Sequence, residues 1–318
     1  MDAALFTTTA AVAASAVAAS AAASAPTDGR LIYDDTDFYS KYEEMSLERT
    51  LCEIPAVFRT IAQWHGARHD DERLRLLDLG CGTGIFTEHL LQTYPVSHVQ
   101  CIDSSARMVD IARTRIQAVA KCDVVSDVRR STIQALQFPP DGSLDLIVAG
   151  LCLHYLDDDD FLTALRQIHS ALAPGGLFVM SQEHPLRLAS KRGLPSAVKD
   201  AQVRRDGWVV VANSHEKDPQ KSQCEQKLKQ KKIGFLVDHY LEEGPRAVRW
   251  MGGVRVLKHH RSMSSIINAC IGAGLSIYLI DECHRMPMLS YEVLDSERVC
   301  VAHYNRRPLF LVLGAVKR

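Results

Sequence analysis

The stretch LLDLGCGTG, residues 76–84, decides the fold of this chain. It reads as an apolar strand that ends near the acidic Asp78 and is followed by three closely spaced glycines, Gly80, Gly82 and Gly84. Glycines let the backbone turn tightly, and they let a ligand approach main-chain N–H groups at the start of a helix. The spacing is GxGxG, whereas dinucleotide-binding loops carry GxGxxG, so the pattern argues against a dinucleotide pyrophosphate. An acid beside the glycines favours a ligand with a positively charged group.

Short apolar segments and amphipathic segments alternate on both sides of this stretch. The expected strands are 74–79, 98–103, 123–126, 144–150 and 176–181. The expected helices are 84–94, 105–120 and 158–172, with one or two more over 34–64. This alternation predicts an α/β fold, in which a doubly wound, mostly parallel sheet is covered by helices on both faces.

The alternation stops at Glu183, which suggests an insertion after the fifth strand. Residues 184–258 are polar and are expected to be irregular, forming a lid on the acceptor side, and a helix at 262–273 with strands at 275–282 and 308–316 then completes the sheet. The predicted units are therefore a tail over 1–30, a core over 31–183, the insertion, and a final unit over 259–318. The tail is rich in Ala and Ser and predicted to be disordered, with a targeting role as the alternative.

The composition limits the classes of function. The chain has 318 residues, 47% of them hydrophobic, and a net charge of −1, so no global field attracts it to DNA or to an anionic membrane. No apolar run is long enough for a convincing membrane span, and we expect a cytoplasmic protein.

The nine cysteines never show CxxC spacing, which indicates neither a zinc site nor a disulfide framework. The lysine-rich stretch 217–232 is predicted to be a solvated loop, with an RNA or acidic partner as the alternative.

A second acidic residue strengthens the interpretation of the glycine stretch. Asp103 ends the next expected strand, 23 residues after Gly80. A carboxylate at this place can accept hydrogen bonds from both hydroxyls of a ribose. The two signals together predict a ligand that contains a nucleoside.

At these residues the sequence resembles the class I S-adenosylmethionine-dependent methyltransferases. The matching segments, in the family's order, are LLDLGCGTG, IDSSARMVDIA, LQFPPDGSLDLIVAGLCLHYL (136–156) and LAPGGLFVMS (172–181). The chain is most similar to a group of small-molecule-type enzymes with HY after the fourth strand, EHP after the fifth and an HR pair later, here in KHHRS (258–262). The resemblance implies a Rossmann-like methyltransferase fold with strand order 3-2-1-4-5-7-6 and an antiparallel last strand.

The resemblance also implies which residues hold S-adenosyl-L-methionine. Those expected to face its methionine part are Asp78, Gly80, Cys81, Gly82 and Gly84. Asp103 would hold the ribose, with Ser104 and Met108 close to the adenosine. Thr132 stands where relatives usually have an acid that contacts the adenine, so main-chain groups near Ile133, or Asp127 after a loop rearrangement, would have to replace that contact.

The candidate catalytic residues follow the fourth and fifth strands or lie in the later HR pair. They are His154, Tyr155, Glu183, His184 and His260. Adjacent side chains on an extended backbone point to opposite sides, so only one of Glu183 and His184 should face the cavity. The alternative is that these groups only tie down the insertion. A metal site is not expected, because no close-spaced ligand set is present.

We therefore expect methyl transfer from S-adenosyl-L-methionine to a small-molecule acceptor by in-line displacement, in which the protein chiefly aligns the two reactants. The expected enzyme is a monomer or homodimer. The alternatives are a catalytically silent cofactor-binding partner subunit, or a methyltransferase that acts on RNA or protein. A nucleotide-dependent oxidoreductase is disfavoured by the GxGxG spacing.

Overall fold

A computed structural model describes residues 32–34, 49–68, 72–189, 201–203, 208–212, 230–235, 240–249, 255–283 and 308–318. The predicted N-terminal tail lies outside these residues, as does most of the lysine-rich stretch 217–232.

The core is a seven-stranded sheet in the order β11-β12-β5-β4-β1-β2-β3. Its strands are β1 (Leu74–Leu79), β2 (Val96–Asp103), β3 (Val125–Arg130), β4 (Leu144–Gly150), β5 (Leu172–Glu183), β11 (Leu275–Asp281) and β12 (Phe310–Lys317). The pairs β1–β2, β1–β4, β2–β3 and β4–β5 are parallel, and β12 runs antiparallel to both β5 and β11. The fold class, the strand order and the antiparallel last strand are confirmed.

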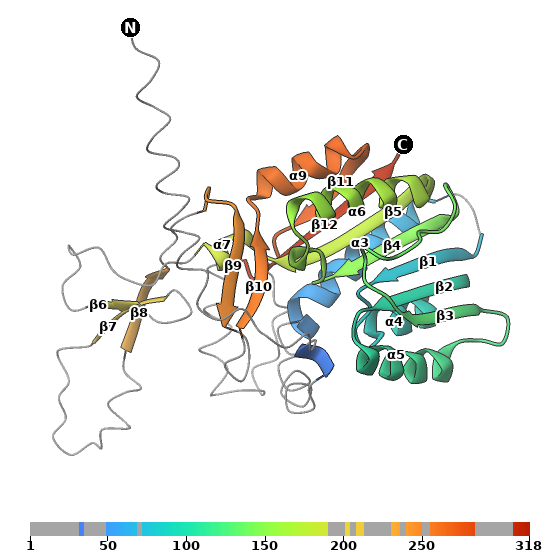
Figure 1. Ribbon diagram of the computed structural model, residues 1–318, viewed down its shortest axis with the longest axis horizontal. Helices are drawn as coiled ribbons and strands as arrows, with labels where there is room; N and C mark the ends of the chain where they lie inside the picture. The colour runs from blue at the N-terminus through green and yellow to red at the C-terminus, as the bar shows by residue number, and fades with distance from the viewer. Residues whose placement is uncertain are drawn as a thin grey trace, which may run out of the picture.

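Helices cover both faces of this sheet (Figure 1). The helices α3 (Ile54–Gly66), α4 (Ile85–Thr93) and α5 (Ala106–Val119) contribute to one hydrophobic core, and α6 (Asp158–Ala171) and α9 (Met263–Gly272) contribute to the other. Three N-caps are side chains that accept a backbone N–H in the first turn, Ser105 for α5, Asp157 for α6 and Ser262 for α9. Three short helical segments are also described, the 3-10 helices η1 (Ile32–Asp34) and η3 (Leu153–Tyr155) and the π-helix η2 (Arg49–Glu53).

The third strand differs from the expected 123–126. It begins at Val125 and runs to Arg130, because Lys121 to Val124 form a turn closed by a hydrogen bond from Val124 N to Lys121 O. The strand lies at the edge of the sheet and is largely exposed, so it lacks the apolar run that marks a buried strand.

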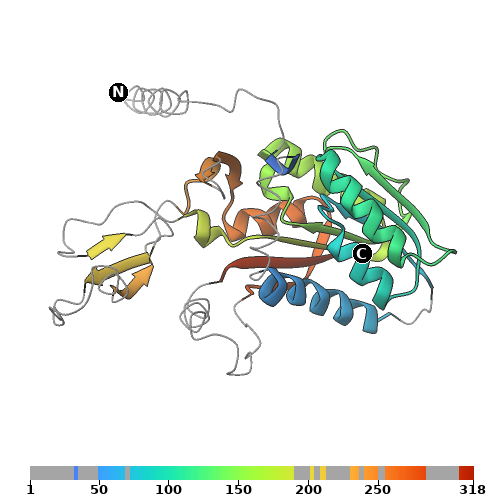
Figure 2. The same cartoon turned by 90° about the horizontal axis from the view of Figure 1, so that it is seen from below.

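The expectation of an irregular insertion is wrong for several segments. After α7 (Pro185–Leu188), the strands β6 (Ala201–Val203), β7 (Trp208–Ala212) and β8 (Gln230–Phe235) form an antiparallel sheet. The strands β9 (Gly244–Arg249) and β10 (Arg255–His260) form an antiparallel hairpin. Figure 2 shows these strands beyond one end of the core sheet. The strands β8, β9 and β10 have many polar residues and no long apolar run, so the sequence pattern did not predict them. The strand β7 is an apolar run, WVVVA, that the prediction of an irregular insertion overlooked.

Among the described residues, no helix has the length and the apolar character needed to cross a membrane.

A partly buried ion pair links β1 to β4. The Oδ2 atom of Asp145 accepts hydrogen bonds from the Arg75 backbone N–H and from Arg75 Nε, each at 2.9 Å. The Oδ1 atom accepts another from the Arg75 guanidinium at 3.0 Å. Burial opposes ionisation of Asp145, but the hydrogen bonds and charge of Arg75 outweigh it and hold the pKa below its usual value.

We predict that Asp145→Asn lowers the free energy of unfolding at neutral pH by about 1–3 kcal/mol, because it weakens a hydrogen-bonded charge pair. The pKa of Asp145 is lower in the folded than in the unfolded protein, so its ionised form stabilises the fold at any pH above the unfolded-state pKa. The difference in unfolding free energy between wild type and Asp145→Asn should therefore shrink as the pH falls through the folded-state pKa of Asp145. Urea unfolding over a pH series measures this. Asp110→Asn, in an exposed pair with Arg113, is the control and should change stability by less than about 1 kcal/mol. A loss in Asp145→Asn that stays constant into strong acid would contradict the assignment.

Candidate functional site

The glycine loop joins the end of β1 to the start of α4. Gly80 has a φ of 63°, and a Cβ atom placed on it would lie 2.6 Å from the Cβ of Cys152, which is closer than atoms can approach. Gly82 has a φ of 55°, and a Cβ placed there would meet nothing within 4 Å. Position 80 therefore needs glycine both for packing and for its backbone conformation. Position 82 needs glycine for its left-handed backbone, and the space beside it is open.

Asp103 lies at the carboxyl end of β2, beside this loop. Its Oδ2 atom accepts a hydrogen bond from Gly82 N and its Oδ1 atom accepts one from Ser105 N, both at 2.9 Å. Burial raises the pKa of this carboxyl, and these backbone hydrogen bonds oppose the rise. Each carboxylate oxygen can accept more than one hydrogen bond, so both can still bind a hydroxyl.

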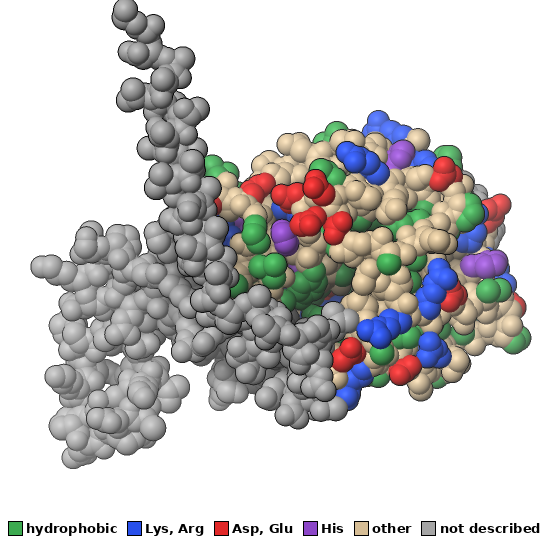
Figure 3. All heavy atoms as spheres, in the orientation of Figure 1, with side chains coloured by type: hydrophobic (Ala, Val, Ile, Leu, Met, Phe, Trp, Pro, Cys, Tyr) green, Lys and Arg blue, Asp and Glu red, His purple; other side chains and the backbone are tan. Residues whose placement is uncertain are grey.

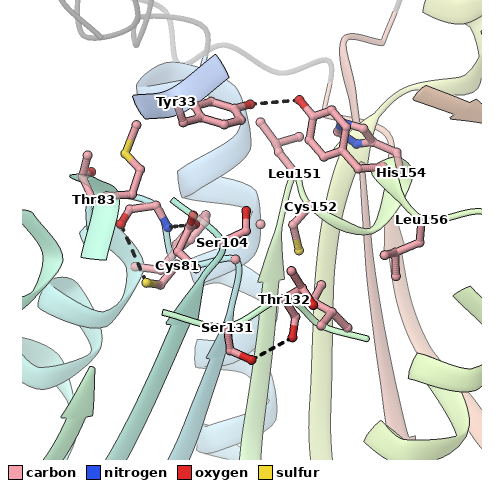
Figure 4. A pocket seen from close by; sticks show the side chains of 18 of the residues that line it. Tyr33, Cys81, Thr83, Ser104, Ser131, Thr132, Leu151, Cys152, His154 and Leu156 are labelled. Carbon is pink, nitrogen blue, oxygen red and sulfur yellow. Dashed lines mark hydrogen bonds between the residues drawn. The ribbon is translucent and has the colours of Figure 1, made fainter. Parts of the chain in front are cut away.

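The loop and Asp103 border a cavity of about 360 Å³ (Figure 4). The predicted site residues that line it are Gly80, Cys81, Gly82, Asp103, Ser104, Met108, Thr132, Ile133, His154, Tyr155 and Glu183. The predicted residues absent from its lining are Asp78, Gly84, His184 and His260. In Figure 4, Cys81, Thr83 and Ser104 lie on one side of the cavity, and His154 and Leu156 lie on the other.

Asp78 is buried below the loop, with 2% of its surface exposed. Its Oδ2 atom accepts a hydrogen bond of 2.7 Å from Thr87 Oγ1, and its Oδ1 atom has no partner among the described residues. Burial raises the pKa of this carboxyl to about 6. Asp78 therefore supports the loop from behind, and it does not line the cavity.

His154 and Tyr155 reach the cavity after an unusual turn at the end of β4. Leu151 has a φ of 54°, a conformation that a bulky residue rarely adopts, and its N–H donates to Ser181 O at 3.0 Å. The chain then enters η3. His154 is 4% exposed, and neither of its ring nitrogens has a partner among the described residues. Burial, assisted by the charge of Lys258, lowers the pKa of His154 to about 3, so this imidazole is neutral.

Glu183 is the last residue of β5 and faces the cavity from the same side. Its Oε2 atom lies 2.8 Å from Lys258 Nζ of β10, and its Oε1 atom lies 3.7 Å from Arg187 Nε. Burial opposes ionisation, but the charges of Arg187 and Lys258 outweigh it and bring the pKa of Glu183 to about 2. This carboxylate is therefore ionised at neutral pH.

His184 and His260 lie outside the cavity lining. His184 accepts a hydrogen bond from Leu186 N at Nδ1, and its Nε2 lies 2.8 Å from Glu282 Oε1. His260 Nε2 donates to Tyr240 O at 2.9 Å. Glu183 thus faces the cavity and His184 does not, as expected from the alternation of adjacent side chains.

The segment around Thr132 closes the cavity next to Asp103. Ser131, Thr132, Ile133 and Gln134 all line it. The Thr132 hydroxyl accepts a hydrogen bond from Ala135 N, so it caps the local turn. Asp127 lies in β3, where its Oδ2 accepts from Gln100 Nε2, and it is not part of the lining.

Several residues that no sequence pattern predicts reach the cavity from distant segments. Tyr33 lines it, and its hydroxyl lies 2.9 Å from the hydroxyl of Tyr155 (Figure 4). The neighbouring Asp34 accepts a hydrogen bond of 2.5 Å from Ser105 Oγ. Arg49, Phe86 and Val256 also belong to the lining. No local pattern identifies these residues, because their contacts depend on the folded chain.

No group of three His, Cys, Asp or Glu side chains in the described part of the chain is arranged to hold a metal ion.

The chain is similar in sequence and fold to known methyltransferases. A family described as a methyltransferase domain matches residues 76–176. An uncharacterized protein of Haemophilus influenzae is 26% identical over 263 residues, which cover 81% of this chain and 87% of that protein. The structure of an S-adenosylmethionine-dependent methyltransferase from Mesorhizobium loti is 27% identical, with a TM-score of 0.54, and the match covers 80% of this chain and 96% of that one. A demethylmenaquinone methyltransferase of Leptospira interrogans is 33% identical over 106 residues, and this chain spans 41% of its length.

We predict that the pKa of Asp78 is visible in the pH dependence of stability. The pKa of Asp78 is raised from 3.8 to about 6 in the folded protein. Its protonated form therefore stabilises the folded state below pH 3.8, and this contribution is lost as the pH rises through about 6. Between pH ~4 and ~7, the free energy of unfolding of the ligand-free wild type should therefore fall by about 2–3 kcal/mol relative to Asp78→Asn. Denaturant unfolding at several pH values measures the difference. A difference that does not vary with pH would contradict the burial of an ionisable Asp78.

Proposed function

Because this chain belongs to the class I S-adenosylmethionine-dependent methyltransferases, we propose that it transfers a methyl group to a small-molecule acceptor bound beside His154, Tyr155 and Glu183. The observation that carries the proposal is the placement of these side chains on the same cavity as the glycine loop and Asp103.

The residues on the loop side fit the cofactor. Both oxygens of Asp103 are positioned by backbone N–H groups, and together they can accept hydrogen bonds from the two hydroxyls of a ribose. The open space at Gly82 allows close approach to the loop backbone. The polar edge at Ser131 and Gln134 would contact the adenine. When bound, the cofactor supplies an activated methyl group on a positively charged sulfur.

The opposite wall would bind and orient the acceptor. A neutral imidazole has one donor and one acceptor nitrogen, and His154 has no partner for either among the described residues, so it can bind a hydroxyl or an amide. The hydrogen bond between Tyr33 and Tyr155 joins the N-terminal turn to this wall. Its role would be to hold Tyr155 in place and help exclude water. Such alignment of two reactants can supply several kcal/mol of the rate enhancement, up to about 7–11 kcal/mol.

A small acceptor suits this wall better than a macromolecule. Val256 of β10 lines the cavity together with Leu156, so the acceptor wall is partly apolar and partly enclosed by the hairpin. On the described part of the face shown in Figure 3, acidic side chains gather in one area and the basic ones are scattered, without the large basic patch that nucleic-acid binding usually needs. The Leptospira relative is named for a small-molecule acceptor, demethylmenaquinone.

An untargeted transfer assay tests the proposal. The protein is incubated with isotopically labelled S-adenosylmethionine and a cell extract, and the products are separated into small-molecule, RNA and protein fractions. We expect label in the small-molecule fraction. Label only in RNA or only in protein would overturn the small-molecule acceptor, and no transfer into any fraction would favour the catalytically silent partner subunit.

We predict that Asp103→Asn weakens the binding of S-adenosylhomocysteine by about 10-fold to 100-fold, because an amide replaces one charged hydrogen-bond acceptor. Isothermal titration calorimetry measures the dissociation constant. Asp110→Asn, on the exposed face of α5, is the matched control and should bind normally. Equal affinities in Asp103→Asn and the wild type would exclude Asp103 from the cofactor site.

We predict that His154→Gln reduces kcat/KM for methyl transfer by about 10-fold to 100-fold and leaves the affinity for S-adenosylhomocysteine within about twofold, because His154 contacts the acceptor side only. The labelled-methyl assay and calorimetry give the two quantities. His98→Gln, on an exposed position of β2, is the control. Loss of cofactor affinity in His154→Gln with normal turnover at saturation would place His154 in the cofactor site.

A further inference from the structure

The short helix η1 contacts both sides of the cavity. The hydroxyl of Tyr33 lies 2.9 Å from that of Tyr155 in the acceptor wall, and the two side chains meet at one end of the cavity (Figure 4). The next residue, Asp34, accepts hydrogen bonds at Oδ1 from Ser105 Oγ at 2.5 Å and from Arg107 N at 3.3 Å. Both donors belong to the start of α5, on the cofactor side of the cavity. Adjacent residues of η1 therefore connect α5 to η3, two elements that are far apart in the sequence.

Ser105 joins η1 to the carboxylate that is proposed to bind the ribose. Its backbone N–H donates to Asp103 Oδ1 at 2.9 Å, and its hydroxyl donates to Asp34 Oδ1. The residue is fully buried and it also caps α5, because its Oγ accepts a hydrogen bond of 3.2 Å from Met108 N. One firmly held residue thus sets the separation of the two carboxylates.

The two carboxylates are close enough to repel each other. Burial is the main cause that raises the pKa of Asp103, and the charge of Asp34 adds to it. A ribose whose hydroxyls donate hydrogen bonds to Asp103 disperses the charge of this carboxylate and weakens the repulsion. Binding of the cofactor should therefore strengthen the contact between Asp34 and Ser105, which holds η1 against α5.

The other end of η1 acts on His154. The ring of Tyr155 packs against the ring of His154, with 4.4 Å between the ring centres. His154 is buried, and neither of its ring nitrogens has a hydrogen-bond partner in the described part of the chain. A buried polar group without a partner costs free energy, so a molecule that reached this ring would gain from a hydrogen bond to it. The position of Tyr155, which Tyr33 helps to hold, therefore decides how such a molecule reaches His154.

We propose that η1 couples the two halves of the cavity, so that a cofactor bound at Asp103 positions Tyr155 for the acceptor. This inference rests on the proposed function and adds Tyr33 to it as a positioning residue, which acts on the acceptor through Tyr155. The coupling is reciprocal, because an acceptor that favours the hydrogen bond between Tyr33 and Tyr155 must also favour the cofactor-bound state. The acceptor should therefore bind more tightly to the enzyme–cofactor complex than to the free enzyme.

Hydrogen–deuterium exchange of the full chain tests the coupling without an acceptor. The amides of Tyr155 and Leu156 donate to carbonyl oxygens three residues earlier, so their exchange reports how firmly η3 is held. We expect saturating S-adenosylhomocysteine to slow this exchange by about 10-fold in the wild type and by less than about twofold in Tyr33→Phe. The protection of residues 80–84 should be the same in both proteins, because the glycine loop contacts the cofactor directly.

Two further variants complete this experiment. Tyr278→Phe removes a hydroxyl from an exposed position of β11 and should behave like the wild type. Asp34→Asn keeps an oxygen that can accept from Ser105 but lacks the charge that responds to Asp103, so the ligand should slow exchange at η3 by less than about threefold. Binding of S-adenosylhomocysteine, measured by calorimetry, confirms that each variant folds. Slowing at η3 in Tyr33→Phe that equals the slowing in the wild type would overturn the inference.

Methyl transfer separates this inference from the proposed function. The labelled-methyl assay is run with the small-molecule fraction of a cell extract at a series of dilutions. In Tyr33→Phe we expect the amount of extract that gives half-maximal transfer to rise by about 5-fold to 10-fold, while the affinity for S-adenosylhomocysteine stays within about threefold of the wild type. An unchanged half-maximal amount would overturn the inference and leave the proposed function intact. Absence of transfer in the wild type would overturn the proposed function, and the exchange experiment would still decide whether η1 couples the two sides.

Discussion

The close approach of Gly80 to Cys152 is the contact on which the cavity depends. It places the end of β1 against the segment that follows β4, with 2.6 Å between the Cys152 Cβ and the position of a Gly80 Cβ, and the Cys152 thiol donates to Leu79 O at 3.1 Å. Any side chain at Gly80 would push the two segments apart. Because they meet, the turn at Leu151 can direct η3 back over the strand ends, and the glycine loop and His154 come to border one cavity. The parallel strands place the other lining segments at the same edge of the sheet, because their carboxyl ends all lie along that edge.

Burial disfavours the charged form of one group below the glycine loop and of one group in the opposite wall of the cavity. Asp78, below the loop, has its pKa raised to about 6, and His154, in the acceptor wall, has its pKa lowered to about 3. Glu183 stays ionised although it is buried, because Lys258 and Arg187 both face it. The acceptor wall thus contains a neutral imidazole beside a compensated carboxylate. Its imidazole can donate and accept hydrogen bonds, and its carboxylate is ionised at neutral pH although it is buried.

The features that could be predicted from the sequence are those that depend on residues close together in the chain. The glycine spacing, the acid that ends β2 and the alternation of strands and helices are signals within a few residues of one another, and they led to the parallel sheet and to the loop side of the cavity. The strand order came from the resemblance to the methyltransferase family. The acceptor wall was less predictable. Glu183 and Lys258 are 75 residues apart, and Tyr33 and Tyr155 are 122 apart, and no periodicity in the chain connects the members of either pair. The hairpin β9–β10 was missed because its polar strands lack an apolar run. His260, expected in the site, lies on that hairpin and bonds to Tyr240 instead.

The central claim is that one cavity, between the glycine loop and η3, holds the cofactor next to the acceptor wall. Hydrogen–deuterium exchange of the full chain with and without S-adenosylhomocysteine measures this most directly. The account predicts slower exchange on binding at the amides of 80–84, 103–105, 131–136 and 151–156, with no change in α9, which packs on the sheet away from the cavity lining. Protection confined to other segments, or unchanged exchange at both the glycine loop and η3 with the ligand bound, would contradict it.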